Sequence, residues 1–349
     1  MKSKWAARSS CSWVAVAVVV GIVSASHAPA QCKTSDYGAS ADSVAAVFDS
    51  HQFVLIGSTH GGEKQQDFLL CLLSRPAFQN RVTDVLVEWA NPVYQGLVDR
   101  YLLQLDEVPS DSLRLVWFDT DAPHLWARLP LIPQFYAAVR AINEKLPLER
   151  RIRVLGGCEP IDWSKVRTTA DVASCSFKNN WAAHVITEHF ATDPKRRLLV
   201  VYGEGHIYHN GGNMMGNLGV SLARDQLFVV GTIAALDPKD AEPAARLGDT
   251  SRLFFLDASR FPAAGPYPRA LFYVQDHALA YYIDAVVFLG PEPDRDLTNQ
   301  IALTAHENDE IARRDAIKGD LRQLLQLRLG ARDRWFRSHP HDLPRDPRR

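Results

Sequence analysis

The sequence predicts an α/β protein with a mostly parallel central sheet and helices on both of its faces. Short runs of aliphatic residues recur along the chain, and stretches with helical spacing of apolar residues lie between them. Unbroken apolar runs are typical of strands buried on both faces, and strands that alternate with helices form parallel sheets. With 349 residues, 46% of them hydrophobic, the chain is long enough to build a large core.

The aliphatic runs place the expected strands at residues 53–57, 84–89, 151–157, 196–203, 226–233 and 285–290. Apolar residues at helical spacing predict amphipathic helices at residues 65–74, 91–105, 131–146 and 179–190. A last helix is expected within 300–329. It carries many charged residues and an apolar stripe through which it would dock onto the body of the protein.

Residues 1–30 carry the pattern of a secretory signal peptide. A basic start leads into the apolar run Trp13–Ala25, and small residues follow at Ala28–Ala30. The run is shorter than the roughly 20 residues that a membrane span needs. We therefore expect cleavage and export to the periplasm or the cell exterior, with no stable membrane span afterwards.

The remaining chain is expected to form one domain over 31–330. Residues 236–268 are rich in Pro, Ala, Gly and Asp, which predicts a long insert or a lid loop. Residues 331–349 form a basic tail that we expect to be disordered. The formal net charge of −1 lacks the basic excess that nucleic-acid binding requires.

Four cysteines follow the signal segment, namely Cys32, Cys71, Cys158 and Cys175. An oxidising compartment favours disulfides between them. The sequence does not choose among the three pairings, and Cys158 with Cys175 closes the shorter loop. Because no CxxC is present, a zinc site made of thiolates alone is disfavoured.

Ionisable residues follow several of the expected strands, where parallel sheets bind their ligands. His60 follows the first strand, Glu88 ends the second, and His206 follows the fourth. Glu88 interrupts an apolar run, and a buried carboxylate is rare without a partner. Each residue alone has a plain structural explanation, such as a surface ion pair or a helix cap. Together they form the candidate catalytic set.

Two imidazoles and a carboxylate suit general-base chemistry, or a divalent metal such as Mn, Co or Zn held by the same three residues. Their spacing does not separate these alternatives, and chemistry without a cofactor is a third. Other residues at the same edge are candidates for substrate binding: Trp89, Asn91, Glu159, Asp162, Glu204 and His209. No GxSxG, Walker-type or strand-linked GxGxxG motif is present.

The stretches "LIGSTHGG", "VLVEW" and "VVYGEGHIYHNGG" resemble motifs of the ChaN-like and TIKI superfamily, whose wider group includes erythromycin esterase-like proteins. The resemblance covers about residues 53–290 and places His60, Glu88 and His206 at the motif positions. Asp284 in "IDAVVFLG" is a further match. Ser58 stands where the group usually has an acid, whose role Glu63 or Glu204 would have to fill.

The resemblance implies several different activities on one fold, and we rank a hydrolase, exported through the signal segment, narrowly first. A histidine-activated or metal-assisted water would attack an ester, a lactone or a peptide, so the expected partner is a small molecule or a peptide. The alternative is an uptake protein that binds haem or iron without turnover, and a purely structural member of the group is a third. Side chains that could ligate haem iron lie around the late motif, namely Tyr202, Tyr208, His209, Met214 and Met215. The sequence does not choose a substrate or an oligomeric state.

Overall fold

The computed structural model describes residues 37–175, 180–187, 193, 195–210, 226–263, 265–268, 271, 277–319 and 346–348. The predicted signal segment and most of the predicted tail lie outside these residues. In the described part of the chain, no helix combines the length and the apolar character that a membrane crossing requires.

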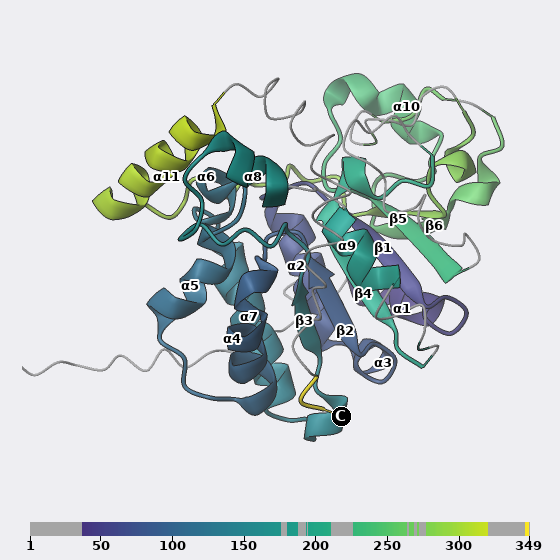
Figure 1. The fold of residues 1–349 in the computed structure, drawn as a ribbon. Helices are drawn as coiled ribbons and strands as arrows, with labels where there is room; N and C mark the ends of the chain where they lie inside the picture. Colours follow the sequence, from purple (N-terminus) through teal and green to yellow (C-terminus); the bar gives the residue numbers. More distant parts are fainter. Residues whose placement is uncertain are drawn as a thin grey trace, which may run out of the picture.

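A seven-stranded sheet forms the centre of the described protein, in the order β3-β2-β4-β1-β5-β7-β6 (Figure 1). Its neighbours pair in parallel, except that β6 runs antiparallel to β7. The strands are β1 (Phe53–Ser58), β2 (Asp84–Val87), β3 (Arg153–Gly156), β4 (Leu198–Gly203), β5 (Leu227–Ile233), β6 (Phe254–Asp257) and β7 (Ala285–Phe288). The predicted α/β class with a mostly parallel sheet is therefore confirmed.

Helices connect the strands and cover the sheet. They are α1 (Tyr37–Val47), α2 (Glu63–Ser74), α3 (Pro76–Gln79), α4 (Gln95–Asp99), α5 (Ser110–Phe118), α6 (Pro123–Trp126), α7 (Leu131–Asn143), α8 (Thr169–Cys175), α9 (Asn180–Val185), α10 (Ala241–Ala245) and α11 (Ala305–Lys318). The helix predicted over 91–105 is interrupted, because α4 passes into a π-helical turn at Arg100–Gln104. The predicted last helix begins at a capping box formed by Thr304 and Glu307.

Alternate residues of each strand enter two hydrophobic cores, one on each face of the sheet. Val54 and Ile56 of β1 belong to the core that α1, α2 and α7 complete. Phe53 and Leu55 belong to the other core, which α9 and residues of the 244–283 region complete. The aliphatic runs of the sequence are explained by this burial on both faces.

The sheet has a topological switch point between β1 and β4. These two strands are neighbours, but the chain leaves β1 toward β2 on one side and leaves β4 toward β5 on the other. Connections that depart in opposite directions open a crevice at the carboxyl ends of the two strands, where ligands bind in open α/β sheets. His60 and His206 follow these two strands directly.

The segment 236–268, predicted as a long insert or lid loop, contains regular structure. It holds α10 and the edge strand β6, which pairs with β7 from Phe254↔Phe288 to Asp257↔Ala285. Its Pro- and Asp-rich composition obscured a four-residue strand whose residues stay partly exposed at the sheet edge. The segment therefore contributes an edge strand to the sheet.

Residues 346–348, at the end of the predicted tail, pack beside β3 (Figure 1). The Arg348 guanidinium donates a hydrogen bond of 2.7 Å to Asp84, a fully buried residue at the start of β2. Arg196 reaches the same Asp84 oxygen at 2.6 Å. A buried ion network thus holds the amino-terminal ends of the strands. The switch point lies at the other end of the strands, where their carboxyl ends meet.

Replacing Asp84 by Ala should lower the free energy of unfolding by about 3–5 kcal/mol, because two buried guanidinium groups lose the carboxylate that they share. Urea unfolding of the full chain measures this change. Asp49→Ala is the matched control, since Asp49 makes an ion pair of 2.7 Å with Arg81 while its side chain is 62% exposed. Equal, small effects of both changes would show that the buried network adds nothing measurable.

Candidate active site

The structure brings His60, Glu88 and His206 together at the carboxyl edge of the sheet. His60 Nε2 lies 3.8 Å from Glu88 Oε2, and His206 Nε2 lies 3.9 Å from Glu88 Oε1. The buried carboxylate therefore lies between two imidazoles, each facing a different oxygen. The His60 side chain is 32% exposed and that of His206 is 14% exposed, so His60 is the more accessible to solvent.

The turn after β1 holds His60 in an unusual backbone conformation. Its φ angle is 56°, in the left-handed region that non-glycine residues seldom adopt. The Gln65 side chain fastens this turn, since Gln65 Oε1 accepts hydrogen bonds from the Thr59 amide (2.7 Å) and hydroxyl (2.9 Å) and its Nε2 donates to the Gly57 carbonyl. Backbone conformations of this kind persist where several contacts hold the residue in place, and they are frequent at functional sites.

Glu88 is fixed by the backbone of β4. Its Oε2 accepts a hydrogen bond of 2.6 Å from the Gly203 amide. A Cβ atom on Gly203 would lie 2.7 Å from His60 Nε2 and 3.1 Å from Glu88 Oε2. Glycine at this position therefore provides the space in which the imidazole approaches the carboxylate.

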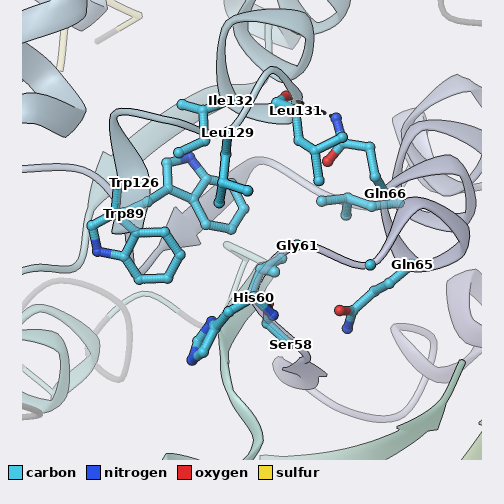
Figure 2. A pocket seen from close by; sticks show the side chains of 13 residues that line it. Ser58, His60, Gly61, Gln65, Gln66, Trp89, Trp126, Leu129, Leu131 and Ile132 are labelled. Carbon is cyan, nitrogen blue, oxygen red and sulfur yellow. Dashed lines mark hydrogen bonds between the residues drawn. The ribbon is translucent and has the colours of Figure 1, made fainter. Parts of the chain in front are cut away.

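A small pocket opens beside His60, with a cavity volume of about 40 Å³ (Figure 2). Trp126 packs edge-on against His60, at 5.0 Å between ring centroids, and Trp89 lies next to Trp126. Ser58, Gln65 and Gln66 contribute the polar part of the lining. The apolar part consists of Leu69, Trp89, Trp126, Leu129, Leu131, Ile132 and Val201. The predicted substrate-binding residue Trp89 therefore lies in the pocket wall.

The three residues are spaced somewhat more widely than the ligands of a tetrahedral zinc ion. Two ligand atoms at a tetrahedral angle on zinc are about 3.3–3.5 Å apart. The N···O separations of 3.8 and 3.9 Å exceed this, and they involve opposite oxygens of Glu88. His60 and His206 thus approach Glu88 at opposite oxygens, and both separations are longer than a direct hydrogen bond.

Glu204 is buried beside the site but points into the sheet. A Cβ atom on Gly57 would lie 2.9 Å from Glu204 Cγ, so the glycine makes room for this side chain. Burial raises the pKa of Glu204 to about 8, although hydrogen bonds from the Thr232 amide and the Tyr208 hydroxyl oppose the rise. At neutral pH the carboxyl is therefore mainly protonated. Glu63, the other proposed substitute for the acid missing at Ser58, lies 3.7 Å from Arg295.

His209 is buried and pairs with Asp284, with 2.5 Å between Nε2 and Oδ2. Asp284 Oδ2 also accepts a hydrogen bond of 2.7 Å from the Val229 amide, and the His209 amide donates to the Tyr282 carbonyl. His206 is therefore carried on a short turn whose far end is tied to β5 and to the segment before β7. This contact joins the two sequence motifs that contain His209 and Asp284.

Three other predicted binding residues lie along the loops after β2 and β3. Asn91 is buried and crosslinks two loops through its side-chain amide, which donates to Asp119 O (2.6 Å) and Ile161 O (2.8 Å). Asp162 pairs with Lys165 at 2.8 Å near the surface. Glu159 is buried and lies 3.4 Å from the Cys158 sulfur.

The predicted disulfide between Cys158 and Cys175 is wrong, because Cys158 is a free, buried thiol. The side chain of Cys175 lies outside the described residues. The thiol instead faces two carboxylates, Glu159 and Asp121. Burial and these neighbouring charges raise the pKa of Cys158 well above its usual value. Loop length alone favoured the pairing and carried no information on where the side chains point.

Sequence reasoning missed Trp126, Gln65 and Asp121. Trp126 belongs to the four-residue helix α6, which is too short for a periodic signal. Gln65 begins a helix that was predicted, but nothing in its spacing marks a contact with Thr59. Asp121 lies in a loop between helices and meets Cys158 only through the tertiary fold.

No known family profile matches the chain, and no curated protein matches its sequence significantly. The fold is similar to the crystal structure of a Bacillus cereus protein, with a TM-score of 0.50, 13% identity and coverage of 77% of this chain and 95% of that chain. The chain also matches the type III effector HopBA1 (TM-score 0.39, 12% identity, 72% and 94% covered). A third match is a structure of ChaN of Campylobacter jejuni titled for its cofacial heme binding. Its TM-score is 0.35 at 13% identity, with 55% of this chain and 85% of that chain covered.

The likeness to the Bacillus cereus structure supports the α/β fold. A ChaN protein is among the matches. At these identities the likeness is one of fold, so the chemistry has to be argued from the site itself.

The raised pKa of Glu204 should make the folded protein less stable as pH rises from about 4.5 to about 8. In this window the unfolded chain has released the proton that the folded protein still holds, so the free energy of unfolding falls by up to about 1.4 kcal/mol per pH unit. Glu204→Gln should remove this contribution, because glutamine does not ionise. Urea unfolding at several pH values measures the difference between the two proteins.

Asp162→Asn is the control for the Glu204 experiment, because the hydrogen bond from Lys165 lowers the pKa of Asp162 and moves its titration below the window. This variant should keep the pH dependence of the unchanged protein. A Glu204→Gln protein with the same decline as the unchanged protein would contradict the assignment of a neutral Glu204.

Proposed function

We propose that the protein is a hydrolase in which His60 activates a water molecule for attack on an ester, lactone or peptide carbonyl. The observation that carries the proposal is Glu88, a buried carboxylate with an imidazole facing each of its oxygens at the switch point of the sheet. We further propose that the protein is exported through residues 1–30, as the signal-peptide pattern indicates.

In the proposed reaction His60 is the general base, because it is the more exposed imidazole and lines the pocket. It takes a proton from water as the water oxygen attacks the carbonyl carbon. Glu88 orients the His60 ring and stabilises the positive charge that the ring acquires. The tetrahedral intermediate then expels its leaving group, which takes the proton from an imidazolium.

His206 is assigned the second role, at the other oxygen of Glu88. A protonated His206, held by the carboxylate, would donate a hydrogen bond to the oxyanion of the tetrahedral intermediate. Its ring lies edge-on to Tyr202, with centroids 5.8 Å apart, which limits its rotation. In this proposal Glu88 therefore orients the general base, His60, and also holds the protonated His206 that stabilises the oxyanion.

The pocket narrows the proposed substrate class. Its wall beside His60 is built mainly from two tryptophans and aliphatic side chains, and His60 is the one ionisable side chain among the described residues that line it. An uncharged, apolar group next to the scissile carbonyl fits such a surface. An ester or lactone with a small aliphatic portion is therefore favoured over a charged peptide.

The geometry supports haem ligation less well than hydrolysis. Tyr202 is buried and donates its hydroxyl hydrogen to Gly157 O at 2.7 Å, and His209 is held by Asp284. Tyr208 is likewise buried. Met214 and Met215 lie outside the described residues. A haem titration of the full chain, followed by its Soret absorbance, would support the alternative if it showed stoichiometric binding.

Replacing His60 by Asn should lower the rate of ester hydrolysis by about 10²–10⁴-fold, the usual contribution of a general base. Asparagine tolerates the left-handed backbone that His60 adopts, so the turn should persist. The assay follows release of p-nitrophenol from a series of aliphatic and aromatic esters. His124→Asn is the matched control, since His124 is an exposed histidine on α6 and should be replaceable without loss.

An unchanged rate in the folded His60→Asn protein would remove the proposed mechanism. The same conclusion would follow if hydrolysis were absent in the unchanged protein for every ester, lactone and peptide offered.

Replacing Gly203 by Ala should reduce hydrolysis by about 10²-fold, because the added Cβ would lie 2.7 Å from His60 Nε2 and displace the ring. The loss should appear in kcat more than in KM, since the apolar pocket wall remains. Gly96→Ala is the matched control, because a Cβ on Gly96 meets nothing within 4 Å. Equal activity of the two variants would show that the spacing of His60 and Glu88 does not matter.

A further inference from the structure

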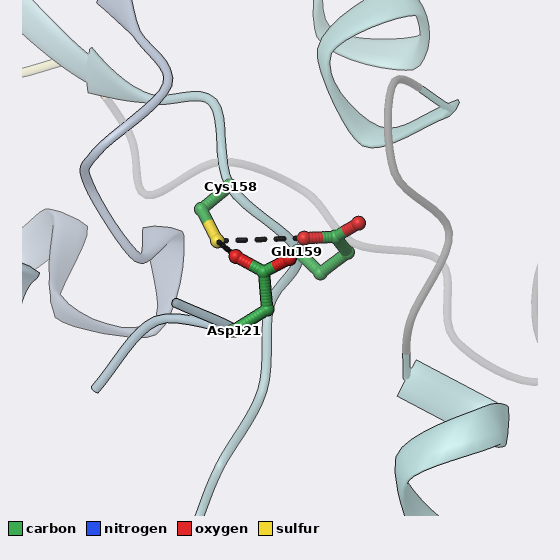
Figure 3. A group of neighbouring side chains, drawn as sticks. All are labelled: Asp121, Cys158 and Glu159. Atoms are coloured by element: carbon green, nitrogen blue, oxygen red, sulfur yellow. Dashed lines mark hydrogen bonds between the residues drawn. The ribbon is translucent and has the colours of Figure 1, made fainter. Parts of the chain in front are cut away.

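Three metal-ligating side chains outside the candidate active site meet between two loops (Figure 3). Cys158 and Glu159 follow β3, and Asp121 lies between α5 and α6. One ligand atom from each residue lies within 4.8 Å of the other two. The Cys158 sulfur is 3.5 Å from Asp121 Oδ1 and 3.4 Å from Glu159 Oε2.

The loops that carry these residues are rigidly joined. The Asn91 side chain bridges Asp119 O and Ile161 O, one carbonyl from each loop. The Trp163 indole donates to the carbonyls of Asp119 and Thr120, both at 3.1 Å. The Cys158 amide donates to Ala90 O at 3.1 Å. The three side chains are therefore held close together by the backbone frame, which is what a preformed ligand site requires.

Two of the three separations, those between the sulfur and each carboxylate, match the edges of a coordination tetrahedron. With a Zn–S distance of about 2.3 Å and a Zn–O distance of about 2.0–2.2 Å, sulfur and oxygen ligands at a tetrahedral angle are about 3.5 Å apart. The two S···O distances here are 3.5 and 3.4 Å. A thiol has one hydrogen for the two carboxylates that it faces, whereas a cation in its place contacts all three ligand atoms at once.

We propose that Asp121, Cys158 and Glu159 bind a zinc ion through three protein ligands. A thiolate favours zinc over magnesium or calcium, which take oxygen ligands. Binding replaces the Cys158 thiol proton by the metal and releases that proton to solvent. Cys158 and Glu159 are buried and Asp121 is half-buried, so the ion enters from the Asp121 side and keeps a water there as its fourth ligand.

None of these three residues lines the His60 pocket, and the proposal does not rest on the proposed hydrolase. A bound ion would crosslink the loop after β3 to the loop between α5 and α6. The absence of a CxxC motif disfavours only a site made of thiolates, and one thiolate with two carboxylates is a different ligand set.

Cobalt titration of the full-length protein, purified without a histidine tag, tests the proposal. Cobalt occupies zinc sites, and a thiolate ligand gives it a near-ultraviolet charge-transfer band that imidazole and carboxylate ligands do not give. One equivalent should produce the band, and zinc should abolish it by displacement. Cys158→Ser should remove the band, and Asp121→Asn should weaken cobalt binding at least about 10-fold.

His60→Asn is the matched control and should keep the band unchanged, which separates this site from the His60 pocket. Far-UV circular dichroism checks that each variant is folded, and Asp121→Asn, in a half-buried loop position, serves if Cys158→Ser does not fold. A missing band at one equivalent in the unchanged protein overturns the proposal. So does a band that persists in Cys158→Ser, or equal cobalt affinity in Asp121→Asn.

Discussion

The pairing of β1 with β4 is the constraint on which the candidate active site depends. Their parallel register sets Ser58 opposite Gly203, so the two strands end at the same level and the turns that carry His60 and His206 begin side by side. β2 pairs with β4 on its other edge and delivers Glu88 between them. A bulkier residue at Gly203 would occupy the space of the His60 ring, so both register and side-chain volume at this position define the site.

Two glutamates at this edge have opposite surroundings. Glu88 accepts a backbone hydrogen bond and faces two imidazoles, so it can stabilise a positive charge beside it. Glu204 lies in a niche left by Gly57 and Gly231, where burial keeps it protonated at neutral pH. The sheet thus separates a carboxylate suited to proton transfer from a neutral carboxyl that packs behind it. The glutamate that follows β4 therefore contributes no charge to the pocket.

Much of the fold could be predicted from the sequence because strands buried on both faces leave unbroken aliphatic runs. The six runs correspond to β1, β2, β3, β4, β5 and β7. The edge strand β6 was missed because three of its four residues are only partly buried and the fourth is exposed, so it carries no comparable signal. The rule that ligands gather beyond strand ends located His60, Glu88 and His206. It could not show which edge residues point into the pocket, because neighbouring residues of one loop, such as Trp89 and Asn91, point in different directions.

The proposed hydrolase site and the proposed zinc site share one stretch of backbone, but each proposal can be tested and rejected without the other. The segment from Glu88 to Asn91 supplies the carboxylate of the hydrolase site, the Trp89 wall of the pocket and the Asn91 bridge beneath the zinc ligands. Each of these functions uses a different side chain of that segment. A change in the Cys158 side chain should retain the hydrogen bond from the Cys158 amide to Ala90 O, because that bond involves only backbone atoms. The hydrolase chemistry therefore requires the register of β1, β2 and β4, whereas metal binding requires only that the loop after β3 stay joined to the loop before α6.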